Sequence, residues 1–296
     1  PANPSSGTPQ YDQLDVRDLE VVSSYTLGAN PATFALVTTP DNVSAYKLNE
    51  DGSSAFLILS ASVAGVKAVQ AGDAAFYMLS QAGDLHIQPV PNNAMFTGPL
   101  SAPWDEPELG TPDDILYSDG RLFALMGGTV KSIDVGGWQS AGASPTSPEL
   151  IEEKLSLPQG AAAHVAVLKA AGDENDRLLI AGGTAGLYES EIFEQEESGA
   201  VLGPASLLWT PQPTGGEPTG VAKVHTQGAD VYAVTQIQED AASFDVTRLV
   251  PTSDGGLIAE WTTTHDGTFT DLVLQGDTLY LLNAAAELTV VNQTCE

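Results

Sequence analysis

The residues best suited to chemistry in this chain are its histidines and a set of aspartates scattered along the sequence. The four histidines are His86, His164, His225 and His265. None has the His-x-x-x-His or His-Glu-x-x-His spacing of a local zinc site. The sequence also has no Gly-x-Ser-x-Gly nucleophile turn and no Gly-Lys-Ser/Thr phosphate loop. Any site must therefore be assembled from residues that are distant in the sequence.

An internal repeat predicts how the fold brings such residues together. Each copy has a polar turn, a short apolar run, a second turn and an alternating segment, as in DGRLFALMGGTVKSIDV from Asp119. Successive copies are 43 to 56 residues apart, measured between the apolar or aromatic anchors Phe34, Tyr77, Phe123, Leu179, Tyr232 and Tyr280. About four strands in a unit of this length are typical of a β-propeller. We therefore predict an all-β, six-bladed β-propeller, with a solenoid of stacked sheets as the alternative.

The two ends of the sequence bear on the domain boundaries and on ring closure. Residues 1–10, PANPSSGTPQ, are polar and rich in Pro, and we interpret them as a linker before a single propeller domain of residues 11–296. The last repeat stops after its third strand, ELTVVN. An N-terminal strand within YDQLDVRDL would supply the missing outer strand and close the last blade, which removes two exposed sheet edges.

Alignment of the repeats on their turn glycines gathers polar residues at one end of the innermost strands. The residues five to nine positions before each turn would face the central channel, and they are Lys67, Asp113, Asp114, His164, Thr219 and Asp271. Oxygen ligands suit Ca²⁺ and other hard cations, so the candidate metal ligands are Asp113, Asp114, His164 and Asp271. The same groups could instead supply an acid–base pair, or simply line a polar channel filled with water.

The charge of the chain restricts its partners. It has 39 Asp and Glu against 10 Lys and Arg, which gives a formal net charge of −29. This balance argues against nucleic acids and anionic membrane surfaces as partners, because both are bound through clustered cations. It favours a bound cation, a basic protein partner or a solvated acidic surface. No apolar run reaches the roughly 18 residues that predict a transmembrane helix.

The single cysteine and the start of the sequence bear on compartment and assembly. Cys295 lies next to the C-terminus, and one thiol cannot form an internal disulfide. We predict that Cys295 links the chain to a second copy or to a partner subunit, with a free thiol as the alternative. The sequence starts at Pro1 without Met, as a processed mature protein or a trimmed chain would. We expect an extracytoplasmic location: secreted, periplasmic or at the cell surface.

Two pairs of glycines, together with the repeat, give the chain a resemblance to a known architecture. Gly127-Gly128 follows FALM and Gly182-Gly183 follows LLIA, as diglycines do in kelch repeats. The other repeats lack the pair, and none has the Gly-His and Trp-Asp markers of WD40 blades. The chain resembles the bacterial extracytoplasmic β-propellers, the architecture shared by lactonase-like and kelch-like proteins. That resemblance implies a fold, and propellers include hydrolases, lyases and binding scaffolds.

Two hypotheses for the function follow from these observations. The first is a non-catalytic interaction module or scaffold, secreted or displayed at a surface, that binds another protein or a surface assembly. It is favoured by the lack of local catalytic motifs and by the acidic composition. The second is a metal-dependent hydrolase or lactonase-like enzyme with its site at the channel mouth. Its basis is the predicted gathering of Asp113, Asp114, His164 and Asp271.

Overall fold

The structure is a computed structural model in which every described element is a β-strand, and no helix occurs among the described residues. The residues it describes are 18–27, 30–39, 42–48, 55–61, 65–72, 75–89, 99–100, 113–126, 129–134, 155–156, 164–170, 175–183, 186–195, 199–212, 217–238, 243–253, 255–275, 278–285 and 287–292. Among these described residues, no helix is long and apolar enough to span a bilayer.

The chain divides into two compact units, which are described separately. Unit 1 comprises Pro1–Pro103 and Trp138–Ser147, and unit 2 comprises Trp104–Gly137 and Pro148–Glu296. The described strands of unit 1 form two antiparallel sheets of four strands each. The first sheet has the order β1 (Asp18–Leu27), β2 (Asn30–Thr39), β3 (Asn42–Leu48), β4 (Ala55–Ala61), and the second has the order β5 (Val66–Ala71), β6 (Ala75–Ser80), β7 (Leu85–Pro89), β8 (Pro99–Leu100).

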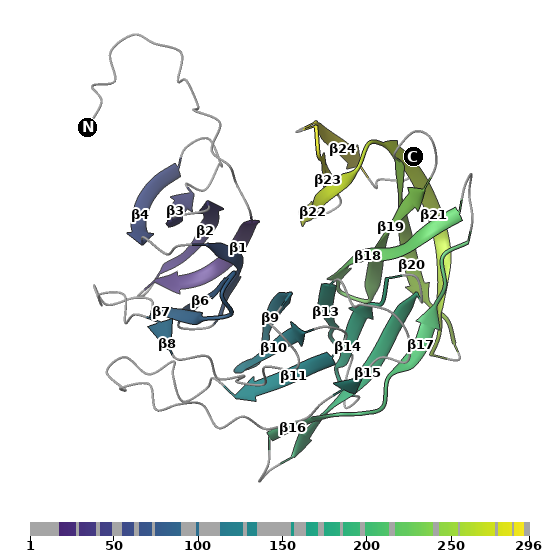
Figure 1. The fold of residues 1–296 in the computed structure, drawn as a ribbon, viewed down its shortest axis with the longest axis horizontal. Coiled ribbons are helices and arrows are strands. Elements are labelled where there is room, and N and C mark those ends of the chain that lie inside the picture. The colour runs from purple at the N-terminus through teal and green to yellow at the C-terminus, as the bar shows by residue number, and fades with distance from the viewer. Residues whose placement is uncertain are drawn as a thin grey trace. The chain divides into compact units, whose positions relative to one another are not determined.

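Unit 2 contributes four further antiparallel sheets, which follow one another in chain order in Figure 1 from teal to yellow. The first comprises β9 (Asp114–Ser118), β10 (Arg121–Met126), β11 (Thr129–Asp134) and β12 (Leu155–Ser156). The second comprises β13 (His164–Leu168), β14 (Arg177–Ala181), β15 (Leu187–Gln195), β16 (Gly199–Leu202) and β17 (Ser206–Trp209). The third comprises β18 (Glu217–Gln227), β19 (Asp230–Gln238), β20 (Ser243–Pro251) and β21 (Leu257–Asp266). The fourth comprises β22 (Phe269–Gln275), β23 (Thr278–Asn283) and β24 (Leu288–Asn292).

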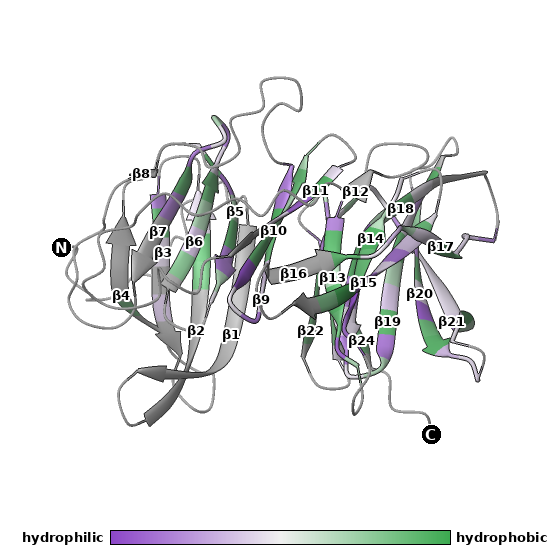
Figure 2. Cartoon of the chain, turned by 90° about the horizontal axis from the view of Figure 1, so that it is seen from below, coloured by the Kyte–Doolittle hydropathy of each residue, from purple (hydrophilic) through white to green (hydrophobic). Residues whose placement is uncertain are grey.

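Hydrophobic layers between neighbouring sheets hold unit 2 together. Phe123 of β10 and Ile180 of β14 belong to one buried cluster, which joins the first sheet of the unit to the second. Tyr232 of β19 and Leu279 of β23 belong to another, which joins the third sheet to the fourth. Because both faces of the middle strands are covered, these strands read as nearly continuous apolar runs, visible as green along β14 in Figure 2.

The turn between β9 and β10 shows how local sequence sets the strand pairing. Asp119 and Gly120 both have positive φ, 47° and 77°. Two such residues in succession form the mirror-image turn whose twist matches that of antiparallel strands, and Asp-Gly is among the sequences that favour it. The pairing then runs without interruption from Arg121 with Ser118 to Leu125 with Asp114. The turn therefore fixes the position of Asp114.

The observed sheets confirm the coarser part of the predicted fold. The chain is all-β, and its repeats are separate antiparallel sheets of mostly four strands, as in a propeller. The last sheet has three described strands and ends at ELTVVN, as expected. The six-bladed count, closure of the last blade by the N-terminal strand and a single domain of residues 11–296 stay predictions. Most of the proposed closing strand precedes residue 18 and lies outside the described residues, and β1 pairs with β2.

Candidate active site on the leading strands of unit 2

Four polar side chains occupy the same position on the first strand of each sheet in unit 2. We call β9, β13, β18 and β22 the leading strands. β13 lies beside both β9 and β18, and β22 lies beside β18. Each leading strand is paired with the next strand of its sheet up to its own last residue. These last residues are Ser118 of β9, Leu168 of β13, Gln227 of β18 and Gln275 of β22. The residues four positions before these ends are Asp114, His164, Lys223 and Asp271.

His164 and Asp114 form the first contact of this group. The Nε2 atom of His164 lies 3.7 Å from Oδ2 of Asp114, which is too far for a hydrogen bond and would be an ion pair only if the imidazole were protonated. Oδ1 of Asp114 accepts a hydrogen bond of 2.9 Å from the backbone N–H of Ile115, which holds the carboxylate in place. The side chains of His164 and Asp114 are 24% and 17% exposed, so both are partly accessible to solvent.

Lys223 and Asp271 form the second contact, between β18 and β22. Nζ of Lys223 donates a hydrogen bond to Oδ1 of Asp271 within an ion pair, and each side chain is 21% exposed. The same Oδ1 atom accepts a hydrogen bond of 2.8 Å from the backbone N–H of Leu272, just as Asp114 accepts one from the residue that follows it. Partial burial makes this ion pair better defined than one on the open surface.

His225 joins the group because it lies two residues after Lys223 and therefore on the same face of β18. Burial and, to a smaller extent, the charge of Lys223 lower its pKa from 6.5 to about 4, although Asp271 acts in the opposite direction. These electrostatic effects connect His225 with both members of the ion pair. The five residues Asp114, His164, Lys223, His225 and Asp271 are called the leading-strand cluster below.

His164 is the most strongly perturbed histidine of the cluster. Burial lowers its pKa well below 6.5, and the nearby Lys223 and His225 lower it further. A hydrogen bond with the backbone of Val224 raises the pKa without offsetting these effects. The Nδ1 atom is buried and has no hydrogen-bond partner among the described residues. Both imidazoles of the cluster are therefore neutral at pH 7, and each can accept a proton.

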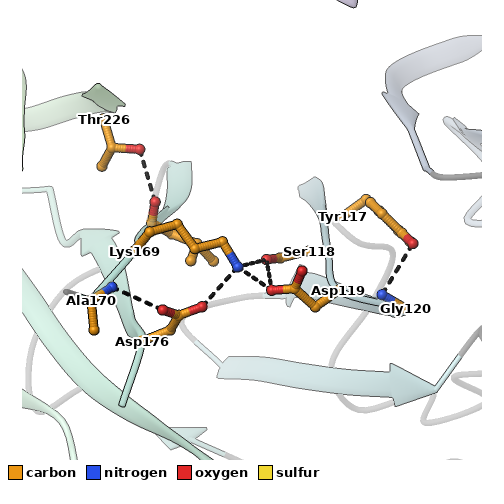
Figure 3. A network of polar contacts seen from close by, with 9 residues as sticks. Tyr117, Ser118, Asp119, Gly120, Lys169, Ala170, Asp176 and Thr226 are labelled. Atoms are coloured by element: carbon orange, nitrogen blue, oxygen red, sulfur yellow. Dashed lines mark hydrogen bonds and ion pairs between the residues drawn. The ribbon is translucent and has the colours of Figure 1, made fainter. Parts of the chain in front are cut away.

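At the ends of the leading strands that lie away from the cluster, a network of hydrogen bonds helps to fix the positions of these strands relative to one another (Figure 3). Lys169, directly after β13, donates hydrogen bonds to Asp119 at the end of β9 and, at 2.7 Å, to Asp176. Thr226 of β18 donates a hydrogen bond of 2.8 Å to the carbonyl oxygen of Val167 in β13. Three leading strands are thus joined near their turn ends, which places Asp114, His164 and Lys223 side by side at the other end.

The structure brings together some of the residues predicted as metal ligands. Asp114 and His164 are in contact, and Asp271 binds Lys223. The exposed Asp113 precedes β9, and its backbone N–H donates to the carbonyl oxygen of Leu125. Among the described residues, no group of three or more His, Cys, Asp or Glu is placed to hold a metal ion. The Ca²⁺ site stays a prediction, and it has no part in the function proposed below.

Three other predicted positions have different outcomes. Lys67 is on β5 of unit 1, so its relation to the cluster stays a prediction. Thr219 lies at an irregularity of β18 between Pro218 and Gly220, and its place at the channel mouth stays a prediction. Lys223 has the position on β18 that corresponds to Asp114, His164 and Asp271. Cys295 and its covalent link lie outside the described residues.

Sequence reasoning missed Lys223 and His225. A second irregularity of β18, between Val221 and Lys223, shifts the strand pairing, so a long count backwards from the turn does not stop at Lys223. The offset of five residues that leads from Gly276 to Asp271 also leads from Gly228 to Lys223, although it does not lead from Gly120 to Asp114 or from Gly172 to His164.

Comparisons with solved structures find proteins of similar fold, two of which have names that refer to lactone hydrolysis. No protein-family model matches the sequence, and no curated protein matches it. The periplasmic gluconolactonase of Pseudomonas aeruginosa is similar in structure, with a TM-score of 0.60 and 12% identity over 94% of this chain and 92% of that one. A putative 6-phosphogluconolactonase from Bacteroides uniformis has a TM-score of 0.58 and 12% identity over 94% and 92% of the two chains. Hsv2p of Kluyveromyces lactis has a TM-score of 0.52 and 13% identity over 95% and 75%. At these identities the likeness concerns the fold alone.

Proposed function

We propose that this chain is a lactonase-like hydrolase whose active site is the leading-strand cluster. The observation that carries the proposal is the contact of His164 with the carboxylate of Asp114, together with the charge of Lys223 that acts on the same neutral imidazole. A proton acceptor beside a cation is what the addition of water to an ester carbonyl requires. The names of the gluconolactonase and the putative 6-phosphogluconolactonase support a lactone as the substrate class.

In the proposed reaction, His164 acts as the general base. The neutral imidazole takes a proton from a water molecule while the water oxygen attacks the carbonyl carbon of the lactone. The ammonium group of Lys223 stabilises the oxyanion of the tetrahedral intermediate. The imidazolium then returns its proton to the ring oxygen as the bond between the carbonyl carbon and that oxygen breaks. One water is consumed, and an open-chain hydroxy acid is released.

Asp114 and Asp271 act as positioning residues in this scheme. A lowered pKa makes His164 a weaker base, and the carboxylate of Asp114 at 3.7 Å compensates by stabilising the imidazolium as it forms. Asp271 holds Lys223 in place through their ion pair. His225 keeps the neighbourhood of Lys223 free of a second positive charge at pH 7, because its own pKa is about 4.

The other features of the chain are compatible with such an enzyme outside the cytoplasm. The gluconolactonase with a similar fold is periplasmic by name, which supports the extracytoplasmic location inferred from the sequence. The non-catalytic interaction module has less support than the lactonase-like reading, since the similar structures include proteins named for lactone hydrolysis. A basic protein partner stays a prediction from the net charge of −29.

The test is the hydrolysis of δ-gluconolactone and of an unsubstituted δ-lactone, followed by acid release against a protein-free blank. We expect wild-type turnover above the blank. His164→Gln should lower kcat by about 10²- to 10⁴-fold, the usual contribution of a general base. Lys223→Met should lower kcat by about 10²- to 10³-fold through loss of oxyanion stabilisation. His265→Gln is the matched control, because His265 is on β21 and outside the cluster.

Two results would contradict the proposal. If folded wild-type protein leaves both lactones at the blank rate, the enzyme reading is wrong and the interaction module is favoured. If His164→Gln and His265→Gln have equal activity, hydrolysis takes place elsewhere. A pH profile adds an independent measurement, since the rate should decrease as acid protonates His164, whose pKa is below 6.5.

A further inference from the structure

The ammonium group of the leading-strand cluster already has a carboxylate bound to it. Nζ of Lys223 donates a hydrogen bond to Oδ1 of Asp271 within their ion pair. Each side chain is 21% exposed, so a substrate that reaches one of them also meets the other. Opposite charges in contact largely cancel at the distance of a bound ligand. The pair therefore acts on a substrate as a nearly neutral hydrogen-bond donor and not as a free cation.

The carboxylate of Asp271 is held in its place beside Lys223. Its Oδ1 atom also accepts a hydrogen bond of 2.8 Å from the backbone N–H of Leu272. Both members of the ion pair are on paired strands, Lys223 opposite Val234 of β19 and Asp271 opposite Leu282 of β23. An anionic group that approaches Lys223 must displace this carboxylate or lie beside it. Either event is unfavourable, because it breaks an ion pair or brings two negative charges together.

The neighbours of Lys223 do not replace the positive charge that Asp271 neutralises. The imidazoles of His164 and His225 are neutral at pH 7, because burial holds both pKa values below 6.5. Three further cations of unit 2 are bound to carboxylates of their own and are not on a leading strand: Lys169, Arg177 and Arg248. The net charge of −29 also repels anions at a distance, most strongly at low ionic strength.

A phosphate group requires a different arrangement from an uncharged ester. A phosphate monoester carries about 1.5 to 2 negative charges at pH 7, and proteins bind it through Arg or Lys groups whose charge is available to it. The carbonyl oxygen of a lactone has no charge and needs only a hydrogen-bond donor. An ammonium group has three N–H donors, so Lys223 retains donors for that oxygen while it binds Asp271. The ion pair thus suits an uncharged lactone better than a phosphorylated one.

We propose that Asp271 determines the substrate class of this site: through its ion pair with Lys223 it selects uncharged lactones and rejects lactones that carry a phosphate group. This inference rests on the proposed function, since it concerns the same site and the same reaction. The substitution Asp271→Asn separates the charge from the geometry. The amide oxygen of Asn can still accept hydrogen bonds from Lys223 and from Leu272, but the charge of the ammonium group is no longer compensated.

The test compares δ-gluconolactone with its 6-phosphate at an ionic strength of about 0.05 M, where charges are weakly screened. The wild-type kcat/KM should be at least about tenfold lower for the phosphorylated lactone, as expected for one uncompensated charge at close range. In Asp271→Asn, the ratio of kcat/KM for the phosphorylated lactone to that for the uncharged one should rise at least about tenfold. Glu260→Gln is the matched control: it changes the net charge equally, but Arg248 stays bound to Asp230 and the ratio should stay unchanged.

Calorimetric titration with inorganic phosphate measures the same effect without turnover. Asp271→Asn should bind phosphate at least about tenfold more tightly than the wild type and Glu260→Gln.

The outcomes separate this inference from the proposed function. Equal wild-type kcat/KM values for the two lactones would overturn the inference and leave the hydrolase intact, and this comparison needs no variant. An unchanged ratio in a folded Asp271→Asn would overturn it too. If the wild type hydrolyses neither lactone, the proposed function fails. The phosphate titration then decides alone, and equal affinities in the wild type and Asp271→Asn would refute the role of Asp271 in excluding anions.

Discussion

Acid should destabilise this protein through His225, and the structure gives the size of the effect. The pKa of His225 is about 4 in the folded chain and 6.5 when unperturbed, because burial and Lys223 disfavour the imidazolium. The unfolded chain therefore binds a proton at a higher pH than the folded chain. The stability that follows from a neutral His225 is complete above pH 6.5 and is lost progressively as the pH falls from 6.5 to about 4.

The magnitude follows from the difference between the two pKa values. Each pKa unit corresponds to about 1.4 kcal/mol, so the loss on going to pH 4 is at most about 3 kcal/mol. His164 acts in the same direction, since its pKa is lowered too. A loss of this size is a substantial part of the roughly 5–15 kcal/mol that stabilise a folded domain.

Urea unfolding between pH 7.5 and 4.5, followed by tryptophan fluorescence, measures this effect. His225→Gln should reduce the loss of unfolding free energy over that range by about 2–3 kcal/mol. Gln227→Ala is the control, because it changes a neighbour on the same strand without removing a titratable group. If His225→Gln loses as much stability in acid as the wild type, the imidazole is already protonated or solvated in the folded chain, and the reasoning about the cluster fails.

Three further predictions concern other parts of the chain. Lys169→Met should lower the unfolding free energy measured in urea by no more than about 1 kcal/mol, because its ion pairs are largely exposed. Gly186→Ala should be more destabilising than Gly255→Ala in the same assay, by about 2 kcal/mol or more. Both glycines have positive φ, but a Cβ at Gly186 would lie 2.5 Å from the carbonyl oxygen of Trp209, whereas a Cβ at Gly255 would have no atom within 4 Å. Cys295, if it links two chains, should give a band of higher mass on a gel without reductant; full reaction of the native protein with a maleimide would show a free thiol instead.

The repeat could be found from the sequence because it marks the most buried strands. Four of its anchors, Tyr77, Phe123, Leu179 and Tyr232, are on the second strands of successive sheets, and each is 0–1% exposed. A strand that is covered on both faces of its sheet has mostly apolar side chains, so its position recurs visibly in the sequence. The all-β class and the division into sheets of about four strands follow from this signal.

The candidate site could be predicted only in part, because no apolar pattern marks it. Asp114, His164 and Asp271 were among the predicted residues, because they lie five to eight positions before the turn glycines Gly120, Gly172 and Gly276. Lys223 was missed because the irregular strand pairing of β18 is not visible in the hydrophobic periodicity, so the count from the turn was extended to Thr219. The contacts across neighbouring sheets, such as the one between Lys223 and Asp271, require the fold itself.

The protonation of the cluster depends on near neighbours and hardly on the overall charge of the chain. A net charge of −29 would favour imidazolium if it acted uniformly on every histidine. Exposed charges are screened beyond about 8 Å at physiological ionic strength, so distant carboxylates contribute little. Burial and the nearby charge of Lys223 keep His164 and His225 neutral. An acidic protein can thus maintain an uncharged imidazole pair, chiefly through burial, with the charge of Lys223 acting in the same direction.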